Sequence, residues 1–258
     1  MTIVYKEVAV HYKVEGQGKP VVLLHGFLEN IEMWNHLAGT LKSSHQVVMI
    51  DLLGHGETGC LGYIHSMEDM AKAVNAVLEN LGVMNAVVIG HSMGGYVALA
   101  LQELFPLRVG AICLLNSTAE SDNEERRLNR DRAIKAVKQN HKAFVSMAVA
   151  NLFAEENRER FATEINDVKN EALKTPLQGI VAALEGMKIR KDRRSQFVNG
   201  KFKKLLVIGL KDPVLDYDSV MGYVSGSDIE LVEFPDGHMS YIEDRKELDY
   251  KILHFIEN

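Results

Sequence analysis

Short runs of consecutive apolar residues recur along the chain, and stretches with helical periodicity separate them. Such runs are typical of parallel strands, which helices cover on both faces of a sheet. The candidate strands of this kind are Val21–Leu24, Val47–Ile50, Val87–Ile89, Ala111–Leu115, Leu205–Ile208 and Ile229–Phe234. One further segment, Val8–Val14, alternates between polar and apolar residues and predicts an edge strand. Strands that alternate with covering helices predict an α/β fold with a mostly parallel, twisted sheet.

The clearest helix signal lies between the second and third of these apolar runs. Ser66 and Asp69 are spaced as an approximate capping box at a helix start. Apolar residues then recur on one helical face up to Leu81, and Gly82 follows as a stop signal. Apolar residues over 248–256 predict a C-terminal helix that packs on the sheet.

The segment from about 119 to 187 interrupts this alternation. It contains no strand-like run, carries many charged residues, and has apolar residues at helical spacing. Because it lies between two predicted core strands, we expect a helical cap inserted after the sixth strand rather than a terminal domain. The expected core then comprises residues 1–118 and 188–258, and the cap comprises residues 119–187.

The most informative local pattern is Gly90-His91-Ser92-Met93-Gly94, which joins a predicted strand to a predicted helix. Strand, Gly-x-Ser-x-Gly and helix in this order are typical of a nucleophile elbow. The serine of such a turn is strained and exposes its Oγ, and the strand and helix approach so closely that only glycine fits beside it. Free N–H groups at the helix N-terminus lie where an oxyanion forms. Ser92 is therefore the candidate nucleophile.

A serine nucleophile requires a base, and the base requires an acid that orients it. In folds with this elbow, the order along the chain is serine, acid, histidine. Asp212 and His238 supply this order, and each directly follows a predicted strand. Both therefore fall with Ser92 at the carboxyl edge of the sheet, where open α/β sheets build their sites. Asp216 is the main local rival for the role of the acid.

An oxyanion hole requires two backbone donors. We expect one from the N–H of Met93, directly after the nucleophile, and the other from Phe27, in the loop after the first apolar run. Gly26 permits a tight turn in that loop. We expect His25 to hold the loop by hydrogen bonds rather than to take part in the chemistry.

Composition and charge exclude several classes of partner. The chain has 258 residues, of which 47% are hydrophobic and 25% charged, and its formal net charge of −6 argues against nucleic acid or an anionic membrane as the main partner. No apolar run approaches the length that spans a bilayer, and no signal peptide is visible. The two cysteines, Cys60 and Cys113, are not expected to form a disulfide, which suits a reducing cytoplasm.

Several segments taken together resemble the α/β-hydrolase-fold family over nearly the whole chain. They are His25–Phe27, Asp51–Gly56, Gly90–Gly95, Gly209–Asp212 and Gly237–His238. Within the family, the chain resembles small capped carboxylesterases and 3-oxoadipate enol-lactonase-like hydrolases, which share the segment Gly186–Arg190 at the return from the cap. This resemblance implies a helical lid over the site. Ser92 stands where the dehalogenases and epoxide hydrolases of this fold carry aspartate, and the His-Gly-Gly-Gly loop of lipases is absent.

These observations predict a cytoplasmic serine hydrolase that cleaves small carboxylic esters or lactones with the triad Ser92, His238 and Asp212. The chemistry requires no cofactor and no metal, and the sequence contains no metal-ligand cluster. The acyl pocket is expected to be lined by the two oxyanion donors, Phe27 and Met93, together with His91, Met147, Phe153 and Met187. A closed lid would restrict that pocket and favour short acyl chains.

Two alternatives stay open at this point. The same triad serves C–C bond hydrolases and lyases, such as the succinyl-cyclohexadiene carboxylate synthase of the menaquinone pathway. An arginine that points into the pocket and binds a carboxylate would favour that class. Other proteins of this fold are ligand receptors that keep an intact triad and turn over slowly. Saturable ligand binding with negligible turnover would identify a receptor.

Overall fold

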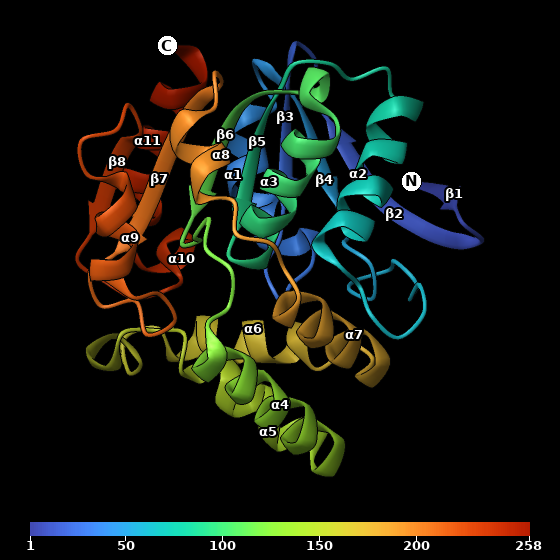
Figure 1. Cartoon of the computed structure of the whole chain (residues 1–258), viewed down its shortest axis with the longest axis vertical. Coiled ribbons are helices and arrows are strands. Elements are labelled where there is room, and N and C mark those ends of the chain that lie inside the picture. The colour runs from blue at the N-terminus through green and yellow to red at the C-terminus, as the bar shows by residue number, and fades with distance from the viewer.

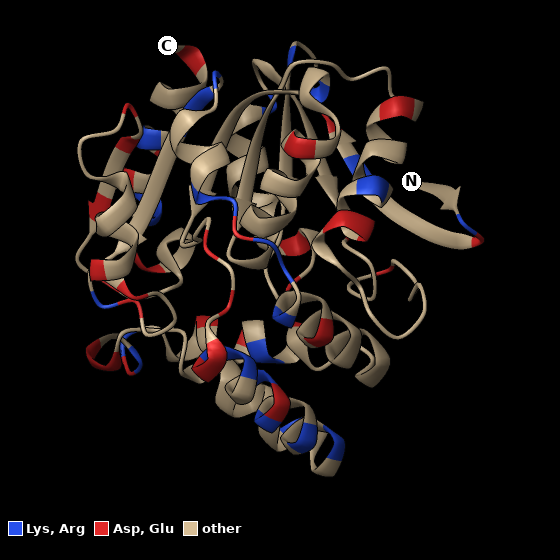
Figure 2. Cartoon of the chain, in the orientation of Figure 1, with Lys and Arg blue, Asp and Glu red and all other residues tan.

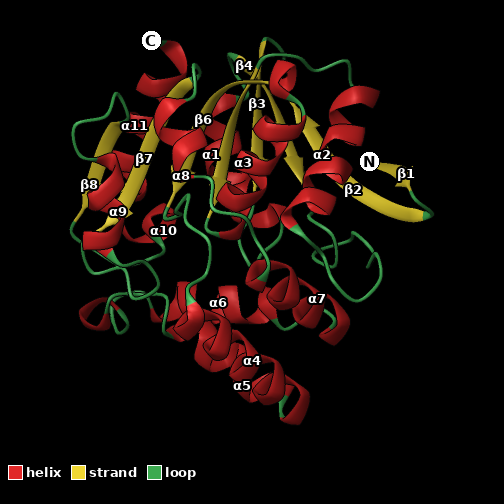
Figure 3. Ribbon diagram, in the orientation of Figure 1, coloured by secondary structure: helices red, strands yellow, loops and turns green.

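The computed structural model describes residues 1–258 and contains one eight-stranded sheet in the order β1-β2-β4-β3-β5-β6-β7-β8. The strands from β4 to β8 in this order are parallel, whereas β1 and β2 run antiparallel to their neighbours. The strands are β1 (Thr2–Tyr5), β2 (Val8–Glu15), β3 (Lys19–Leu24), β4 (His45–Ile50), β5 (Ala86–His91), β6 (Val109–Leu115), β7 (Lys203–Gly209) and β8 (Glu230–Phe234). The sheet is therefore mostly parallel, as predicted (Figure 3).

Each predicted strand forms, but the position of one of them in the sheet is wrong. Val8–Val14 is predicted at the edge, yet β2 lies second, because β1 pairs with it from Thr2 opposite His11 to Tyr5 opposite Val8. The sequence of β1 alone only weakly predicts a strand, because β1 has four residues and none of them is fully buried. The alternation in β2 arises because one face of this strand packs on the core while the other is partly exposed.

Alternate residues of the central strands point to opposite faces of the sheet and belong to two hydrophobic clusters. In β3, Val22 and Leu24 join one cluster, and Val21 and Leu23 join the other. The first face is covered by α2 (Met67–Asn80), α3 (Met93–Leu104), α8 (Arg194–Asn199) and α9 (Tyr217–Val224), and the second by α1 (Asn35–Leu41) and α11 (Arg245–Glu257) (Figure 1). Because both faces are covered, the strands read as uninterrupted apolar runs.

Helix α2 begins and ends where the sequence predicts. The side-chain oxygen of Ser66 accepts a hydrogen bond from the backbone N–H of Asp69 at 3.0 Å. Seven residues of the helix are buried and form the apolar face that packs against the sheet and α3. The chain leaves the helix through Gly82 at φ 66°, a conformation that glycine adopts without strain.

Between β6 and β7 the chain forms five α-helices and no strand, and the first four of these helices precede the return to the core. These four are α4 (Glu124–Gln139), α5 (His141–Ala150), α6 (Ala162–Ala172) and α7 (Leu177–Lys188), which we call the helical insertion together with their connecting loops. Figure 1 shows these helices as a separate layer across one end of the sheet. The segment that leaves the core and the segment that returns to it lie side by side, because the N–H of Arg193 donates to the carbonyl of Ala119 at 2.8 Å.

Short helical turns complete the chain. They are η1 (Ile31–Trp34), η2 (Pro106–Arg108), η3 (Glu155–Asn157) and α10 (Ser240–Glu243). No helix is both long enough and apolar enough to cross a bilayer. Figure 2 shows that acidic and basic residues both lie on the helices and loops, and that few lie on the central strands. The basic residues that follow α7 are largely paired with acidic ones, as Arg193 is with Glu68 and Glu103.

Candidate active site

Ser92 lies at the turn between β5 and α3. Its backbone has φ 49° and ψ −114°, a strained conformation for a residue other than glycine. The strand and the helix approach closely here. A Cβ atom on Gly94 would lie 2.2 Å from the carbonyl oxygen of Leu24, and one on Gly90 would lie 2.4 Å from that of Gly94. The turn therefore has the geometry that the Gly-x-Ser-x-Gly pattern predicts.

The imidazole of His238 is hydrogen-bonded to the carboxylate of Asp212. Its Nδ1 lies 2.7 Å from Asp212 Oδ2, and both side chains are almost inaccessible. Asp212 follows β7 and His238 follows β8, so the pairing of these two parallel strands brings them together. Since the carboxylate accepts a hydrogen at Nδ1, Nε2 is left as the nitrogen that can take a proton from Ser92.

The surroundings of Asp212 stabilise its ionised form. Its Oδ1 accepts hydrogen bonds from the backbone N–H groups of residues 214 and 215, at 2.8 and 3.0 Å, and the amide of Asn116 lies 3.3 Å from Oδ2. Burial alone would raise the pKa of Asp212, but the charge and hydrogen bond of His238 and the backbone donors lower it below its usual range. Asp216 instead caps α9, 3.1 Å from a backbone N–H.

The loop after β3 is held by His25. The Nδ1 of this residue donates to the carbonyl of Gly26 at 2.8 Å, and its Nε2 accepts from the backbone N–H of Leu52 at 2.9 Å. Burial lowers the pKa of His25, so the ring stays neutral and holds the loop in place through these two hydrogen bonds. Leu28, two residues beyond the turn, has φ 65°, a second strained position beside the reaction cavity.

The two predicted oxyanion donors flank the nucleophile. Met93 directly follows Ser92 and is the first residue of α3, where helix geometry leaves N–H groups without a partner inside the helix. Phe27 lines the same cavity as Ser92. An anion at this point would also face the positive end of the α3 dipole.

Ser92 and His238 line one cavity of about 160 Å³. Most of its other walls are apolar, and Phe27, Tyr96 and Val214 come from the core. The helical insertion contributes Ala148, Leu152 and Met187 to the same walls. The insertion therefore covers Ser92 and His238 at the carboxyl edge of the sheet.

Two of the four predicted pocket residues are not at the cavity. His91 and Met187 line it, but Met147 is 58% exposed on the outer side of α5. Phe153 is buried in a separate cluster with Phe161. Helical spacing identified both residues as apolar, but it does not distinguish a cavity wall from the packing between elements.

Hydrogen bonds join the loop that carries His238 to the insertion. The backbone N–H of His238 donates to the carbonyl of Leu152 at 2.9 Å. The buried carboxylate of Glu243 accepts from the N–H of Gly237 and from the N–H of Ala154, both at 3.1 Å. His238 and this corner of the insertion are therefore parts of one hydrogen-bonded unit.

Glu29 is a site residue that the sequence reasoning missed. It lines the cavity, its side chain is 4% exposed, and its Oε2 lies 2.7 Å from His91 Nδ1. The only sign of this role in the sequence is the position of the acidic residue, three residues after Gly26 and directly after the apolar pair Phe27-Leu28.

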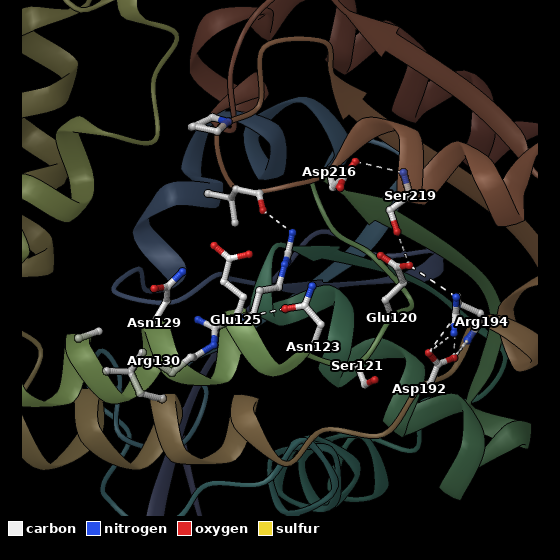
Figure 4. Close-up of a pocket in the computed structure, with 15 residues that line it drawn as sticks. Glu120, Ser121, Asn123, Glu125, Asn129, Arg130, Asp192, Arg194, Asp216 and Ser219 are labelled. Carbon is white, nitrogen blue, oxygen red and sulfur yellow. Dashed lines mark hydrogen bonds and ion pairs between the residues drawn. The ribbon is translucent and has the colours of Figure 1, made fainter.

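Arg130 is a second missed residue. It reaches the wall of the cavity from α4, and it also lines a larger polar hollow of about 670 Å³ next to the cavity. Figure 4 shows Arg130 on one side of this hollow and Asp216 and Ser219 on the other. Arg130 and Val214 border both spaces, so the hollow and the cavity lie side by side. Nothing in the charge pattern of α4 shows which of its arginines points inward.

The arrangement supplies the parts for acyl transfer, namely a strained serine, a histidine held by a buried carboxylate, and backbone donors at a helix N-terminus. No group of three or more His, Cys, Asp or Glu side chains is placed to hold a metal ion.

Comparison with known proteins places this geometry in a family. The sequence pattern of the alpha/beta hydrolase fold matches residues 19–245. The acetyltransferase component (dihydrolipoyllysine-residue type) of the acetoin cleaving system of Pseudomonas putida is 28% identical over 246 residues, which are 93% of this chain and 64% of that protein. A putative carbamate hydrolase of Azorhizobium caulinodans is 31% identical over 118 residues, 46% of this chain and 44% of that protein. The chain thus spans less than two thirds of the length of these relatives.

Solved structures show the same fold over the whole chain. A thermophilic esterase from Thermogutta terrifontis is 25% identical, covers 98% of this chain and 95% of its own, and superposes with a TM-score of 0.88. The enol-lactonase of Burkholderia xenovorans is 20% identical, covers 100% of both chains, and has a TM-score of 0.90. The fold, the elbow and the matched sequence pattern together show that this chain belongs to the α/β-hydrolase fold family.

Proposed function

We propose that this chain is a serine hydrolase that cleaves small carboxylic esters or lactones through an acyl-enzyme on Ser92. The observation that carries the proposal is the His238–Asp212 pair at the same cavity as a strained Ser92. Nucleophile, base and orienting acid are the groups that acyl transfer requires. The similarity to an esterase that covers 98% of the chain supports the same reaction class.

In the first half-reaction, the acyl group passes to the enzyme. Ser92 Oγ attacks the carbonyl carbon while His238 Nε2 takes the hydroxyl proton, and the N–H groups of Phe27 and Met93 stabilise the oxyanion. The bond to the leaving oxygen then breaks, and His238 gives its proton to that oxygen. Asp212 stabilises the imidazolium. Water next attacks the acyl-enzyme with His238 again as the base, which releases the acid and restores Ser92.

The size of the cavity favours small acyl groups. Its volume of about 160 Å³ lies below the roughly 300–1,000 Å³ of pockets for drug-sized ligands. Ala148 and Met187 of the insertion line it, and their apolar side chains limit the access of water to the reacting atoms. We expect a preference for acyl chains of up to about six carbons. A series of p-nitrophenyl esters from acetate to palmitate tests this, and an optimum at the long end would contradict it.

The nucleophile is tested by labelling and mutation. A fluorophosphonate probe should modify Ser92, and Ser92→Ala should lower kcat at least about a thousandfold with folding intact, because only binding and the oxyanion donors remain. Labelling at another serine, or full activity of Ser92→Ala, would exclude this mechanism. Saturable binding of a small ester with no turnover by the unmodified chain would indicate a receptor.

Arg130 supports a second candidate function, C–C bond hydrolysis or a lyase reaction on a substrate that carries a carboxylate. Its Nε lies 2.9 Å from Asp122 Oδ2, and Asp122 is also bonded to Arg190, so two guanidinium groups share one buried carboxylate. Of these three side chains only Arg130 lines the cavity, where a guanidinium group would bind a substrate carboxylate well.

Matched substrates test the carboxylate recognition that the second candidate requires. Mono-p-nitrophenyl succinate and p-nitrophenyl butyrate differ mainly in the terminal carboxylate. A preference for the succinate that Arg130→Met removes, while exposed Arg127→Met on the same helix keeps it, favours a carboxylate-bearing substrate. Equal rates on both esters in every variant would leave the simple esterase as the better assignment.

A further inference from the structure

A buried carboxylate joins three parts of the candidate site without any lysine or arginine partner. Glu29 Oε2 accepts a hydrogen bond from the N–H of Gly26 at 2.7 Å and lies 2.7 Å from His91 Nδ1. Its Oε1 accepts from the hydroxyl of Tyr241 at 3.1 Å. A lone ionised carboxylate at this depth is costly, so the side chain needs a positive partner.

The two ring nitrogens of His91 both face acceptors. Nε2 lies 3.0 Å from the backbone carbonyl of His238, which cannot donate, so this nitrogen carries a hydrogen. Nδ1 faces the carboxylate of Glu29, which already accepts from Gly26 on the same oxygen. A ring with hydrogens on both nitrogens is an imidazolium, and the side chain of His91 is only 1% exposed.

The charges around the pair agree with this geometry. Burial lowers the pKa of His91, but the carboxylate of Glu29 outweighs burial and the pKa lies above its usual range. Burial raises the pKa of Glu29, but the charge of His91 brings it below its usual range. The other titratable groups that face the pair are Tyr241 and His238, whose rings lie 5.4 and 5.2 Å from that of His91, and, through space, Asp212 and His25.

We propose that Glu29 and His91 form a buried ion pair that positions the oxyanion loop and the catalytic base around Ser92. The pair links Gly26, next to the proposed donor Phe27, to the backbone of His238. Neither residue exchanges a proton with the substrate, so both are positioning residues. This inference rests on the proposed esterase function and extends it.

The charge state of His91 matters because of its place beside the nucleophile. With His91 protonated, the pair is neutral overall and adds no negative charge near the oxyanion. With His91 neutral, the carboxylate of Glu29 is unpaired next to the loop that must stabilise a developing anion. Two histidines at one cavity therefore need opposite states for catalysis, His238 neutral and His91 charged.

Enzyme kinetics test the pair through a pH profile. For wild type with p-nitrophenyl butyrate, kcat/KM should fall at alkaline pH as His91 loses its proton. Glu29→Gln removes the charge that holds the second proton, so its alkaline limb should move to lower pH. We expect kcat to fall at least about tenfold, with KM changed less than about threefold, because the groups that stabilise the transition state are displaced.

A control variant and a direct measurement complete the test. His36→Gln disrupts another histidine–carboxylate pair, with Asp249 on the surface, and should leave the profile unchanged. Nitrogen-15 NMR of the histidine rings, assigned with His91→Gln, should show one ring that stays doubly protonated at pH values where an ordinary histidine, with a pKa of about 6.5, is neutral. This reading needs no turnover, so it separates failure of the pair from failure of the proposed esterase function, which Ser92→Ala tests. A His91 ring that is neutral at pH 7, or a Glu29→Gln enzyme with the wild-type kcat and pH profile, would overturn the proposal.

Discussion

Replacing Gly94 by alanine tests the close approach that forms the serine turn. The added Cβ would lie 2.2 Å from the carbonyl oxygen of Leu24 and 2.7 Å from that of His25, whereas ordinary contacts begin near 3.4 Å. Both neighbours are backbone atoms at the end of β3, so no side chain can rotate away. Helix α3 and the strand must separate by about an ångström, and a shift of that size can lower the rate about a hundredfold.

The expected loss of stability follows from the same contact. Overpacking a buried site costs about 1–3 kcal/mol, and a backbone clash belongs at the upper end of that range. For a chain of this size, about 3 kcal/mol corresponds to a fall in Tm of roughly 6–12 °C. Gly39→Ala is the matched control, because its Cβ meets nothing within 4 Å on helix α1. That variant should gain about 0.5–1 kcal/mol, since alanine is the better helix former.

Urea unfolding followed by the fluorescence of Trp34, the single and buried tryptophan, measures both variants in one assay. Ester hydrolysis measured on the same samples shows whether Ser92 stays in place. If Gly94→Ala matched wild type in unfolding free energy and in kcat/KM, the argument from close approach would be refuted.

Other expectations concern the core, the thiols and the response to acid. Leu23→Ala, at a fully buried position in β3, should cost about 2–5 kcal/mol in urea unfolding, and a cost under 1 kcal/mol would contradict tight packing there. Burial raises the pKa of both the Cys60 and Cys113 thiols, and Cys113 is fully buried, so a thiol reagent should react slowly with Cys60 in the native chain and with Cys113 only after unfolding. Burial would raise the pKa of Asp122, but its two arginine partners lower it, so the stability it contributes is present above its unfolded pKa of about 3.9 and is lost as pH falls through the lower folded value. Asp122→Asn should therefore lower the unfolding free energy by about 3–5 kcal/mol at pH 7 and by clearly less at pH 3, and an equal loss at both pH values would refute the assignment.

The fold was predictable because its strands are buried on both faces. Val21–Leu24 and similar runs leave no polar position, and the turn around Ser92 has a sequence pattern that follows from its geometry. β1 escaped prediction because a short, half-exposed edge strand depends on its pairing with β2 rather than on its own sequence.

The walls of the cavity were less predictable, for a geometric reason. Ala148 lines the cavity, whereas the neighbouring Met147 is exposed, and one residue turns a helix by about 100°. The sequence shows that α5 is apolar on several sides without showing which side meets the cavity. The placement of Glu29 depends on Tyr241, which is far away in the chain, and that of Arg130 depends on how α4 packs over the cavity. Local sequence patterns specify neither.

The hydrogen bond from His238 to Leu152, with the carboxylate of Glu243 beside it, decides how substrate can reach this site. If the insertion lifted as a flap from that corner, it would pull the base away from the serine. We expect substrate to pass instead between Arg130 and Val214, which line both the cavity and the larger hollow. On that route the insertion stays in place over Ser92 and His238, and we expect turnover not to depend on a large hinge motion.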